Sequence, residues 1–147
     1  MRDEAITQRF MLLKLNEVQK RADVVFQKMR RMEEANDAGV VRCVSCGRFH
    51  HFSQVDSGHF IPRAHKGTRY ERFNVWPQCK HCNYHLHGNT SKFRERLVEL
   101  MSKEGVENME ADKDKETWHP KSWREHCIDI YLSSKKRIKE LSNHLVA

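Results

Sequence analysis

Two Cys-x-x-Cys pairs enclose the stretch that decides the fold of this chain: C-V-S-C at residues 43–46 and C-K-H-C at residues 79–82. Between and just after them lie D-S-G-H-F-I-P at residues 56–62, N-V-W-P-Q at residues 74–78 and N-Y-H-L-H-G-N at residues 83–89. Each pair offers two thiolates from one turn of chain, and structural zinc takes four such ligands at tetrahedral corners. We therefore predict one structural Zn²⁺ with four cysteine ligands: Cys43, Cys46, Cys79 and Cys82.

A closed four-cysteine site has no open position for water, so residues for catalysis must lie elsewhere in the stretch. His59 lies between the two pairs, and a neutral imidazole can accept a proton from water near pH 7. Asn83 directly follows the fourth cysteine, and its amide oxygen is a hard ligand suited to Mg²⁺ or Mn²⁺. Asp56, His85 and His87 are further candidate ligands for this catalytic metal, and the sequence does not choose among them.

The N-terminal segment carries apolar residues at alternating steps of four and three, which predicts one long helix over residues 5–35. This spacing is the seam of a coiled coil, so we expect the helix to form a homodimer. Packing against the helix's own domain is the alternative. The seam consists of Met11, Leu15, Val18, Ala22, Val25, Met29 and Met32.

The remaining elements predict an α+β fold with a zinc-stapled core. We expect short strands in residues 40–62, a helix over residues 80–87, a helix from residue 90 to Gly105, an acidic loop or short helix at residues 106–117, and a last helix over residues 121–145. In residues 54–61 a period of two places His59 and Asp56 on opposite faces, unless Gly58 forms a bulge. Cys127 is expected to be a free thiol on the last helix.

These elements suggest three regions along the chain. Residues 1–38 form the long helix, residues 39–105 the zinc-bound core, and residues 106–147 the acidic segment and the basic C-terminal helix. The sequence has no apolar segment of signal-peptide or membrane-spanning length. We therefore expect no membrane partner and a cytoplasmic location.

The charge of the chain favours a polyanionic partner. Among 147 residues, 27 Lys and Arg stand against 20 Asp and Glu, which gives a net charge of +7. Nucleic acid is the commonest partner of such a protein. A basic loop follows His59, and cations beside a candidate active site suit contacts with DNA phosphates. These candidate DNA-binding residues are Arg63, Lys66, Arg69 and Arg72.

The order of Cys-x-x-Cys, His, Asn and Cys-x-x-Cys-Asn resembles the zinc-bound HNH (ββα-metal, His-Me finger) nucleases over residues 43–89. Within it, D-S-G-H-F, R-Y, N-V-W-P-Q-C-K-H-C-N and H-G-N resemble the phage NinG (Rap) recombination endonucleases, to about residue 105. The layout is also similar to phage endonuclease VII, a dimeric four-cysteine zinc resolvase. The location would then be the cytoplasm of a bacterial host.

The resemblance implies roles for three residues. His59 would be the general base, Asn74 would brace the loop through backbone hydrogen bonds, and Asn83 would bind the divalent metal. Gly58 departs from the pattern, because the residue before the base is often an Asp or His that binds metal. His85 fits the NinG pattern better than His87 does.

The function expected from these features is metal-dependent hydrolysis of DNA phosphodiester bonds. The resemblance alone points to branched recombination intermediates such as Holliday junctions or D-loops. One alternative is a non-catalytic zinc-ribbon module that binds nucleic acid, which would have the same cysteines and charge. Another is a homing or restriction-type HNH endonuclease.

Overall fold

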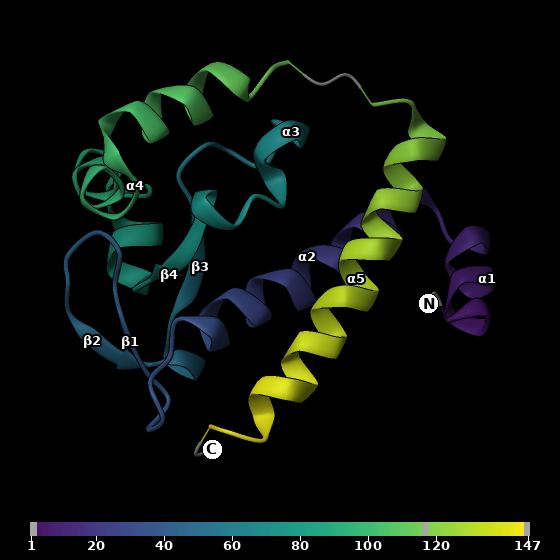
Figure 1. Cartoon of the computed structure of the whole chain (residues 1–147), viewed down its shortest axis with the longest axis horizontal. Helices are drawn as coiled ribbons and strands as arrows, with labels where there is room; N and C mark the ends of the chain where they lie inside the picture. The colour runs from purple at the N-terminus through teal and green to yellow at the C-terminus, as the bar shows by residue number, and fades with distance from the viewer. Residues whose placement is uncertain (1–2, 116–117, 146–147) are drawn as a thin grey trace.

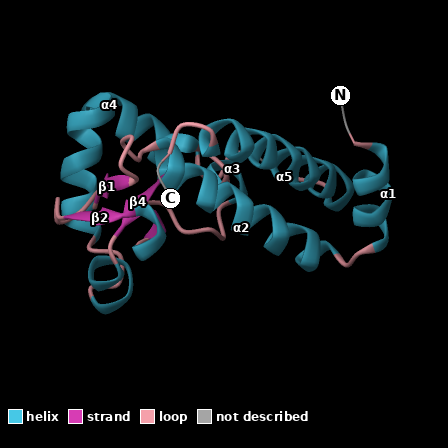
Figure 2. Ribbon diagram, turned by 90° about the horizontal axis from the view of Figure 1, so that it is seen from below, coloured by secondary structure: helices cyan, strands magenta, loops and turns pink. Residues whose placement is uncertain are grey.

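Helices and two small antiparallel sheets make up the computed structural model, which describes residues 3–115 and 118–145 (Figure 1). The fold is therefore α+β, as predicted. The strands gather at one end of the molecule together with α4, and α2 and α5 extend away from them (Figure 2). The elements are α1 (Glu4–Leu12), α2 (Leu15–Glu33), β1 (Val40–Arg42), β2 (Phe49–His51), η1 (Phe52–Gln54), β3 (Asp56–His59), α3 (Lys66–Arg69), η2 (Arg72–Asn74), β4 (Val75–Gln78), η3 (His81–His85), α4 (Thr90–Asp112) and α5 (Pro120–Ser142).

The second sheet, β3 with β4, supports the candidate site. Its register pairs Asp56 with Gln78 and His59 with Val75 through four consecutive residues, so Gly58 forms no bulge. Glycine is needed at position 58 for another reason: an added Cβ would overlap the side-chain oxygen of Gln78. Gln78 is buried, and its Nε2 donates to Ser45 Oγ (2.9 Å), which joins β4 to the first cysteine turn.

The prediction of a single helix over residues 5–35 is wrong. The chain is extended at Leu13 (ψ 155°) and Lys14 (ψ 148°), which separates α1 from α2. No Pro or Gly causes this break. Arg124 of α5 donates to the carbonyl oxygens of Phe10 (2.9 Å) and Leu13 (2.6 Å), so a partner distant in sequence binds the backbone where the helix ends.

The predicted coiled-coil seam is largely covered by α5 of the same chain. Val18 and Ala22 are fully buried in one cluster with Trp123 and Ile128 of α5. Figures 1 and 2 both show α2 and α5 side by side. The homodimer remains a prediction, but in this structure the buried part of the seam is not available as its interface.

The C-terminal half of α4 also differs from expectation. The helix does not stop at Gly105 but continues to Asp112, with a kink at Ser102 (φ 73°, ψ 159°). Ser102 Oγ accepts a hydrogen bond from the Gly105 amide (3.1 Å) and so caps the second half. Val106 and Met109 of the acidic stretch are buried beside Phe93 and Leu97, which is why this stretch is helical as far as Asp112. The acidic loop or short helix was predicted over residues 106–117, and residues 116–117 lie outside the described residues.

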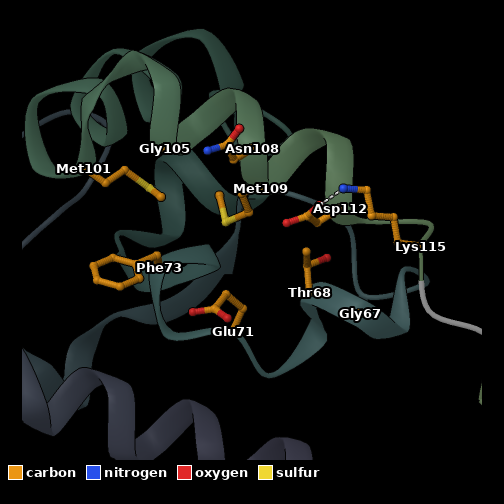
Figure 3. A pocket seen from close by; sticks show the side chains of 10 residues that line it. All are labelled: Gly67, Thr68, Glu71, Phe73, Met101, Gly105, Asn108, Met109, Asp112 and Lys115. Atoms are coloured by element: carbon orange, nitrogen blue, oxygen red, sulfur yellow. Dashed lines mark ion pairs between the residues drawn. The ribbon is translucent and has the colours of Figure 1, made fainter.

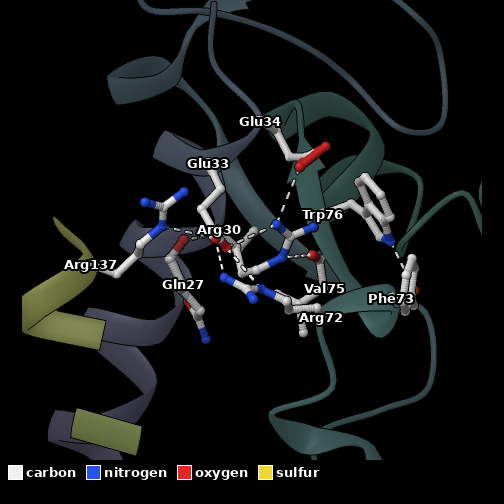
Figure 4. A network of polar contacts seen from close by, with 10 residues as sticks. Gln27, Arg30, Glu33, Glu34, Arg72, Phe73, Val75, Trp76 and Arg137 are labelled. Carbon is white, nitrogen blue, oxygen red and sulfur yellow. Dashed lines mark hydrogen bonds and ion pairs between the residues drawn. The ribbon is translucent and has the colours of Figure 1, made fainter. Parts of the chain in front are cut away.

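A cluster of charged side chains connects α2, α5 and β4 (Figure 4). Glu33 of α2 pairs with Arg30 (3.2 Å), Arg137 (3.4 Å) and Arg72. Arg30 Nε also donates to the carbonyl oxygen of Val75 (2.9 Å), the strand partner of His59. Helix α2 therefore helps to fix the strand that lies beside the candidate base.

Among the described residues, every helix is too short or too polar to span a lipid bilayer.

Candidate functional site

The four predicted cysteine ligands come together as a candidate zinc site. The Sγ atoms of Cys43, Cys46, Cys79 and Cys82 all lie within 4.8 Å of one another. Zn–S bonds of about 2.3 Å at tetrahedral angles would place the sulfurs about 3.8 Å apart, and the Cys46–Cys79 separation is 3.8 Å. Gly47 (φ 77°) makes the left-handed turn that closes the first pair. The residues present therefore fit a tetrahedral zinc ion.

Hydrogen bonds to the sulfurs prepare this site for a cation. Burial raises the pKa of Cys43, but N–H donors that include the Cys79 amide (3.3 Å) outweigh it and lower the pKa to about 7. Burial raises the pKa of Cys82 to about 12, although Asn89 Nδ2 donates to its sulfur (3.5 Å). One thiol of the set therefore ionises near neutral pH without metal, and metal binding would displace the other protons.

A surface hollow of about 420 Å³ gathers most of the other predicted residues. It lies where α2, β3 and η3 meet. We call it the β3 hollow. Asp56 and His59 both line it, although alternation predicted them on opposite faces, because β3 is only four residues long and the hollow includes both of its ends. The lining residues are Gln27, Arg31, Asp56, Ser57, His59, Pro62, Arg63, Asn83, His87 and Gly88.

A hydrogen bond fixes the tautomer of His59, which is a neutral imidazole. Its Nε2 lies 3.0 Å from the carbonyl oxygen of Arg69. A carbonyl can only accept, so Nε2 carries the proton and Nδ1 keeps its lone pair. Burial lowers the pKa of His59 to about 4, more than the bond to Arg69 raises it. Nδ1 is therefore free to accept a proton at neutral pH.

Asn74 is fully buried and ties together the loop that follows His59. Its Nδ2 donates to the carbonyl oxygens of Ile61 and Thr68 (both 3.0 Å), and its Oδ1 accepts from the Ile61 amide (2.7 Å). The backbone of Asn74 also accepts from Phe60 (3.0 Å). These are the backbone hydrogen bonds that the resemblance implies for this residue.

Asp56, Asn83 and His87 are the candidate ligands for a divalent metal that line the hollow. Asp56 receives hydrogen bonds from Lys80 Nζ (2.9 Å) and Asn83 Nδ2 (3.1 Å). Burial raises the pKa of Asp56, but these bonds and the charge of Lys80 outweigh it and lower the pKa, so the group is a carboxylate. A carboxylate and an amide oxygen, the latter exposed by rotating the Asn83 amide, are the ligand types that suit Mg²⁺ or Mn²⁺, and the His87 imidazole would add a softer nitrogen ligand. His85 is not among the lining residues; its ring contacts His81 and Tyr84 instead.

The four predicted DNA-binding cations have different surroundings. Arg63 lines the hollow with an exposed side chain, and Lys66 lies over the Trp123 ring (5.3 Å). Arg69 is buried against Asp23, so the DNA contact predicted for it does not fit its position. Arg72 is half exposed and pairs with Glu33.

Sequence reasoning missed the contribution of α2 to this site. Asp23 accepts from Arg69 Nε (2.9 Å) and from Tyr70 Oη (2.8 Å), and the carbonyl of Arg69 in turn orients His59. Gln27 and Arg31 line the hollow itself. The sequence contains only a weak indication that α2 contributes to the site. Charged residues beside an apolar seam are equally typical of a helix whose polar face is exposed to solvent.

Asp23 is expected to stabilise the fold strongly. Asp23→Ala would leave the buried Arg69 guanidinium without its counter-ion, and breaking such a pair costs roughly 3–5 kcal/mol. Urea unfolding followed by circular dichroism measures the change in the free energy of unfolding. Asp37→Ala removes an exposed aspartate and should change that free energy by less than about 0.5 kcal/mol. Equal effects of the two substitutions would contradict this role for Asp23.

A second cavity, of about 490 Å³, lies between α3, η2 and α4 (Figure 3). Its walls include Thr68, Glu71, Met101 and Asn108. None of the predicted catalytic or metal-binding residues is among its lining residues, so the β3 hollow is the candidate functional site.

Comparison with known proteins identifies the family. The chain matches the family described as "Bacteriophage Lambda NinG protein" over residues 2–144. It is 29% identical over 102 residues to "Protein ninG" of Escherichia phage 933W and of Escherichia phage lambda, and 30% identical over 100 residues to that of Salmonella phage P22. These alignments cover 69%, 69% and 67% of this chain but 48%, 48% and 47% of the relatives.

The chain thus spans about half the length of the curated relatives it matches. No solved structure matches it. The family match covers nearly the whole chain, including the cysteine site and every residue of the β3 hollow. This protein therefore belongs to the NinG family of bacteriophage proteins.

Proposed function

We propose that this protein is a metal-dependent endonuclease that hydrolyses phosphodiester bonds in DNA. One observation carries the proposal: His59, with an unprotonated Nδ1, lines the same hollow as Asp56, Asn83 and His87. A module that only binds nucleic acid has no need for a half-buried neutral base beside candidate metal ligands. The net charge of +7 favours a polyanionic substrate.

The chain order around the hollow supports an HNH-type arrangement. Two antiparallel strands, β3 and β4, are followed by the short π-helical segment η3. His59 lies at the end of the first strand, and Asn83 lies in the helical segment. This is the strand–strand–helix order of the ββα-metal nucleases that the sequence resembles.

The residues of the hollow suggest a division of labour. His59 Nδ1 takes a proton from a water molecule, whose oxygen attacks phosphorus in line with the leaving 3′ oxygen. Asn74 holds the loop after His59, and Arg63 contacts the DNA backbone at the rim of the hollow. A bound Mg²⁺ or Mn²⁺, held by Asp56, Asn83 and His87, would supply Lewis-acid stabilisation of the charge on the phosphate.

The substrate we propose is branched DNA, such as a Holliday junction or a D-loop, in the cytoplasm of a bacterial host. This choice rests on the sequence resemblance to phage recombination endonucleases. A homodimer would suit the two-fold symmetry of a junction, and it remains part of the proposal. The non-catalytic binding module and the homing or restriction-type endonuclease are the competing outcomes.

The test is cleavage of matched substrates by the purified zinc-loaded protein. A four-way junction and a linear duplex of the same arm sequence are incubated with Mg²⁺, with Mn²⁺ or without divalent metal, and zinc content is checked in each sample. We expect cuts close to the branch point that require Mg²⁺ or Mn²⁺, and slower cutting of the duplex. Junction binding without cleavage at any metal concentration would favour the binding module, and sequence-dependent cuts in the duplex would favour the restriction type.

A further inference from the structure

Arg31 of α2 places a guanidinium in the wall of the β3 hollow. One of its nitrogens, Nη1, donates to Ser57 Oγ (3.1 Å). Its Nε is buried and has no hydrogen-bond partner within the part of the chain that the structure describes. A buried donor without a partner is costly, and this one belongs to a side chain that lines the hollow.

Neighbouring arginines do not share this property. Arg30 donates from Nε to the Val75 carbonyl (2.9 Å) and pairs with Glu33 (3.2 Å). Arg69 donates from Nε to Asp23 (2.9 Å). The guanidiniums of Arg30 and Arg69 therefore both have hydrogen-bond partners at Nε. The Nε of Arg31 has no such partner among the described residues.

The charges in the hollow indicate what Arg31 would bind. Two guanidiniums, Arg31 and Arg63, line it together with one carboxylate, Asp56, which already pairs with Lys80 (2.9 Å). His59 is neutral at physiological pH. The lining therefore carries a net positive charge and favours an anion, and the planar fork of a guanidinium matches the oxygens of a phosphate group.

We propose that Arg31 binds a non-bridging oxygen of the DNA phosphate group that is cut in the β3 hollow. The inference rests on the proposed function, because it assigns the phosphate to the same site as His59. It makes Arg31 a substrate contact rather than a support for β3. Arg31 belongs to the helix that the sequence resemblance left outside the nuclease motif.

Binding is measured first, in a way that does not require cleavage. Junction affinity is determined for His59→Ala protein over a range of salt concentrations, with and without Arg31→Gln. Each phosphate contact contributes about 0.9 to the slope of log affinity against log salt, so Arg31→Gln should reduce that slope by about 1. Arg9→Gln, an exposed change on α1 at the end of the molecule opposite the strands (Figure 2), should leave it unchanged.

Cleavage by protein with His59 intact gives the second measurement. Arg31→Gln should slow cutting by roughly 10²–10³-fold, as loss of one donor to a developing charge does in other enzymes. Arg31→Lys keeps the charge and should keep the salt slope, but it loses the planar fork and should still cut slowly. Ser57→Ala removes the one side-chain hydrogen bond that Arg31 makes within residues 3–115 and 118–145, and it should have the smaller defect.

The outcomes separate this inference from the endonuclease proposal. A reduced slope in a protein that never cuts DNA would support the phosphate contact and refute the endonuclease. An unchanged slope in Arg31→Gln protein with normal zinc content and melting temperature would overturn the phosphate contact. So would equal cleavage defects in Arg31→Gln and Ser57→Ala, because Arg31 would then act only by holding Ser57.

Discussion

Replacing His59 with alanine should reduce DNA cleavage by roughly 10²–10⁴-fold, the usual effect of losing a general base, and leave zinc content and DNA affinity nearly unchanged. The reason is its place in the hollow: Nε2 is held by the Arg69 carbonyl, and Nδ1 is left to accept a proton. Single-turnover rates on junction DNA measure the effect. His144→Ala, an exposed change beyond the end of α5, is the matched control and should cut normally.

The dependence on pH makes this prediction sharper. Burial lowers the pKa of His59 from 6.5 to about 4, so the base should stay active until the pH falls toward 4. Below pH 6.5 the imidazole of His59 is protonated in the unfolded chain but stays neutral in the folded chain. The free energy of unfolding should therefore decrease as the pH falls from 6.5 toward 4. His59→Ala should remove that part of the acid destabilisation. An acid limb of the cleavage rate near pH 6.5 would contradict a base whose pKa is lowered in this way.

Asn83→Ala should also slow cleavage, but in a different way. Asn83 contacts Asp56 in the hollow and is a proposed metal ligand rather than a base. Its loss should therefore weaken metal binding and be partly corrected by higher Mn²⁺ or Mg²⁺. The His59→Ala defect should not respond to metal.

Wild-type cleavage rates in His59→Ala protein would eliminate His59 as the base.

Removal of a zinc ligand should have the largest effect on the fold. Cys79→Ala or Cys82→Ala removes a buried residue whose sulfur lies within 4.8 Å of the other three, and it should abolish zinc binding and unfold much of the protein. Structural zinc in small domains contributes about 10–16 kcal/mol of apparent binding free energy, and that energy is coupled to folding. Metal analysis and circular dichroism measure the two effects.

Cys127→Ala is the control for these substitutions. Cys127 is also fully buried but lies in the cluster between α2 and α5, where burial raises its thiol pKa to about 11. This variant should keep one zinc per chain and lose only a little stability from the smaller side chain. Full zinc content in Cys79→Ala protein would show that the metal is not held by the four cysteines.

Contacts between distant parts of the chain cross the three predicted regions. Phe10 and Val18 share a cluster with Trp123, and Phe26 shares one with Val75. Ser57 of β3 donates to the Gln27 carbonyl of α2 (2.7 Å). The helix expected to serve assembly therefore also supports the core and forms one wall of the candidate site.

Local sequence was enough to predict the cysteine cluster of the central stretch. Thiolates at Cys-x-x-Cys spacing converge from one turn each, so the grouping of Cys43, Cys46, Cys79 and Cys82 is encoded locally. The candidate base and the candidate metal ligands were found because their residue types are few and lie next to those pairs. The resemblance to the NinG family was visible on the same residues, and the family match confirms that part of the resemblance.

The contacts of α2 and the position of its first residue depend on packing between segments that are distant in the sequence. At the break before α2, the carbonyl of Leu13 accepts a hydrogen bond from Arg124, which lies 111 residues further along the chain, and no local pattern encodes such a contact. An apolar seam specifies that a face is buried but not whether a second chain or α5 covers it. The packing of α2 against β3 also places two arginines that the sequence could not place. It buries Arg69 against Asp23, and it brings Arg31 into the lining of the hollow.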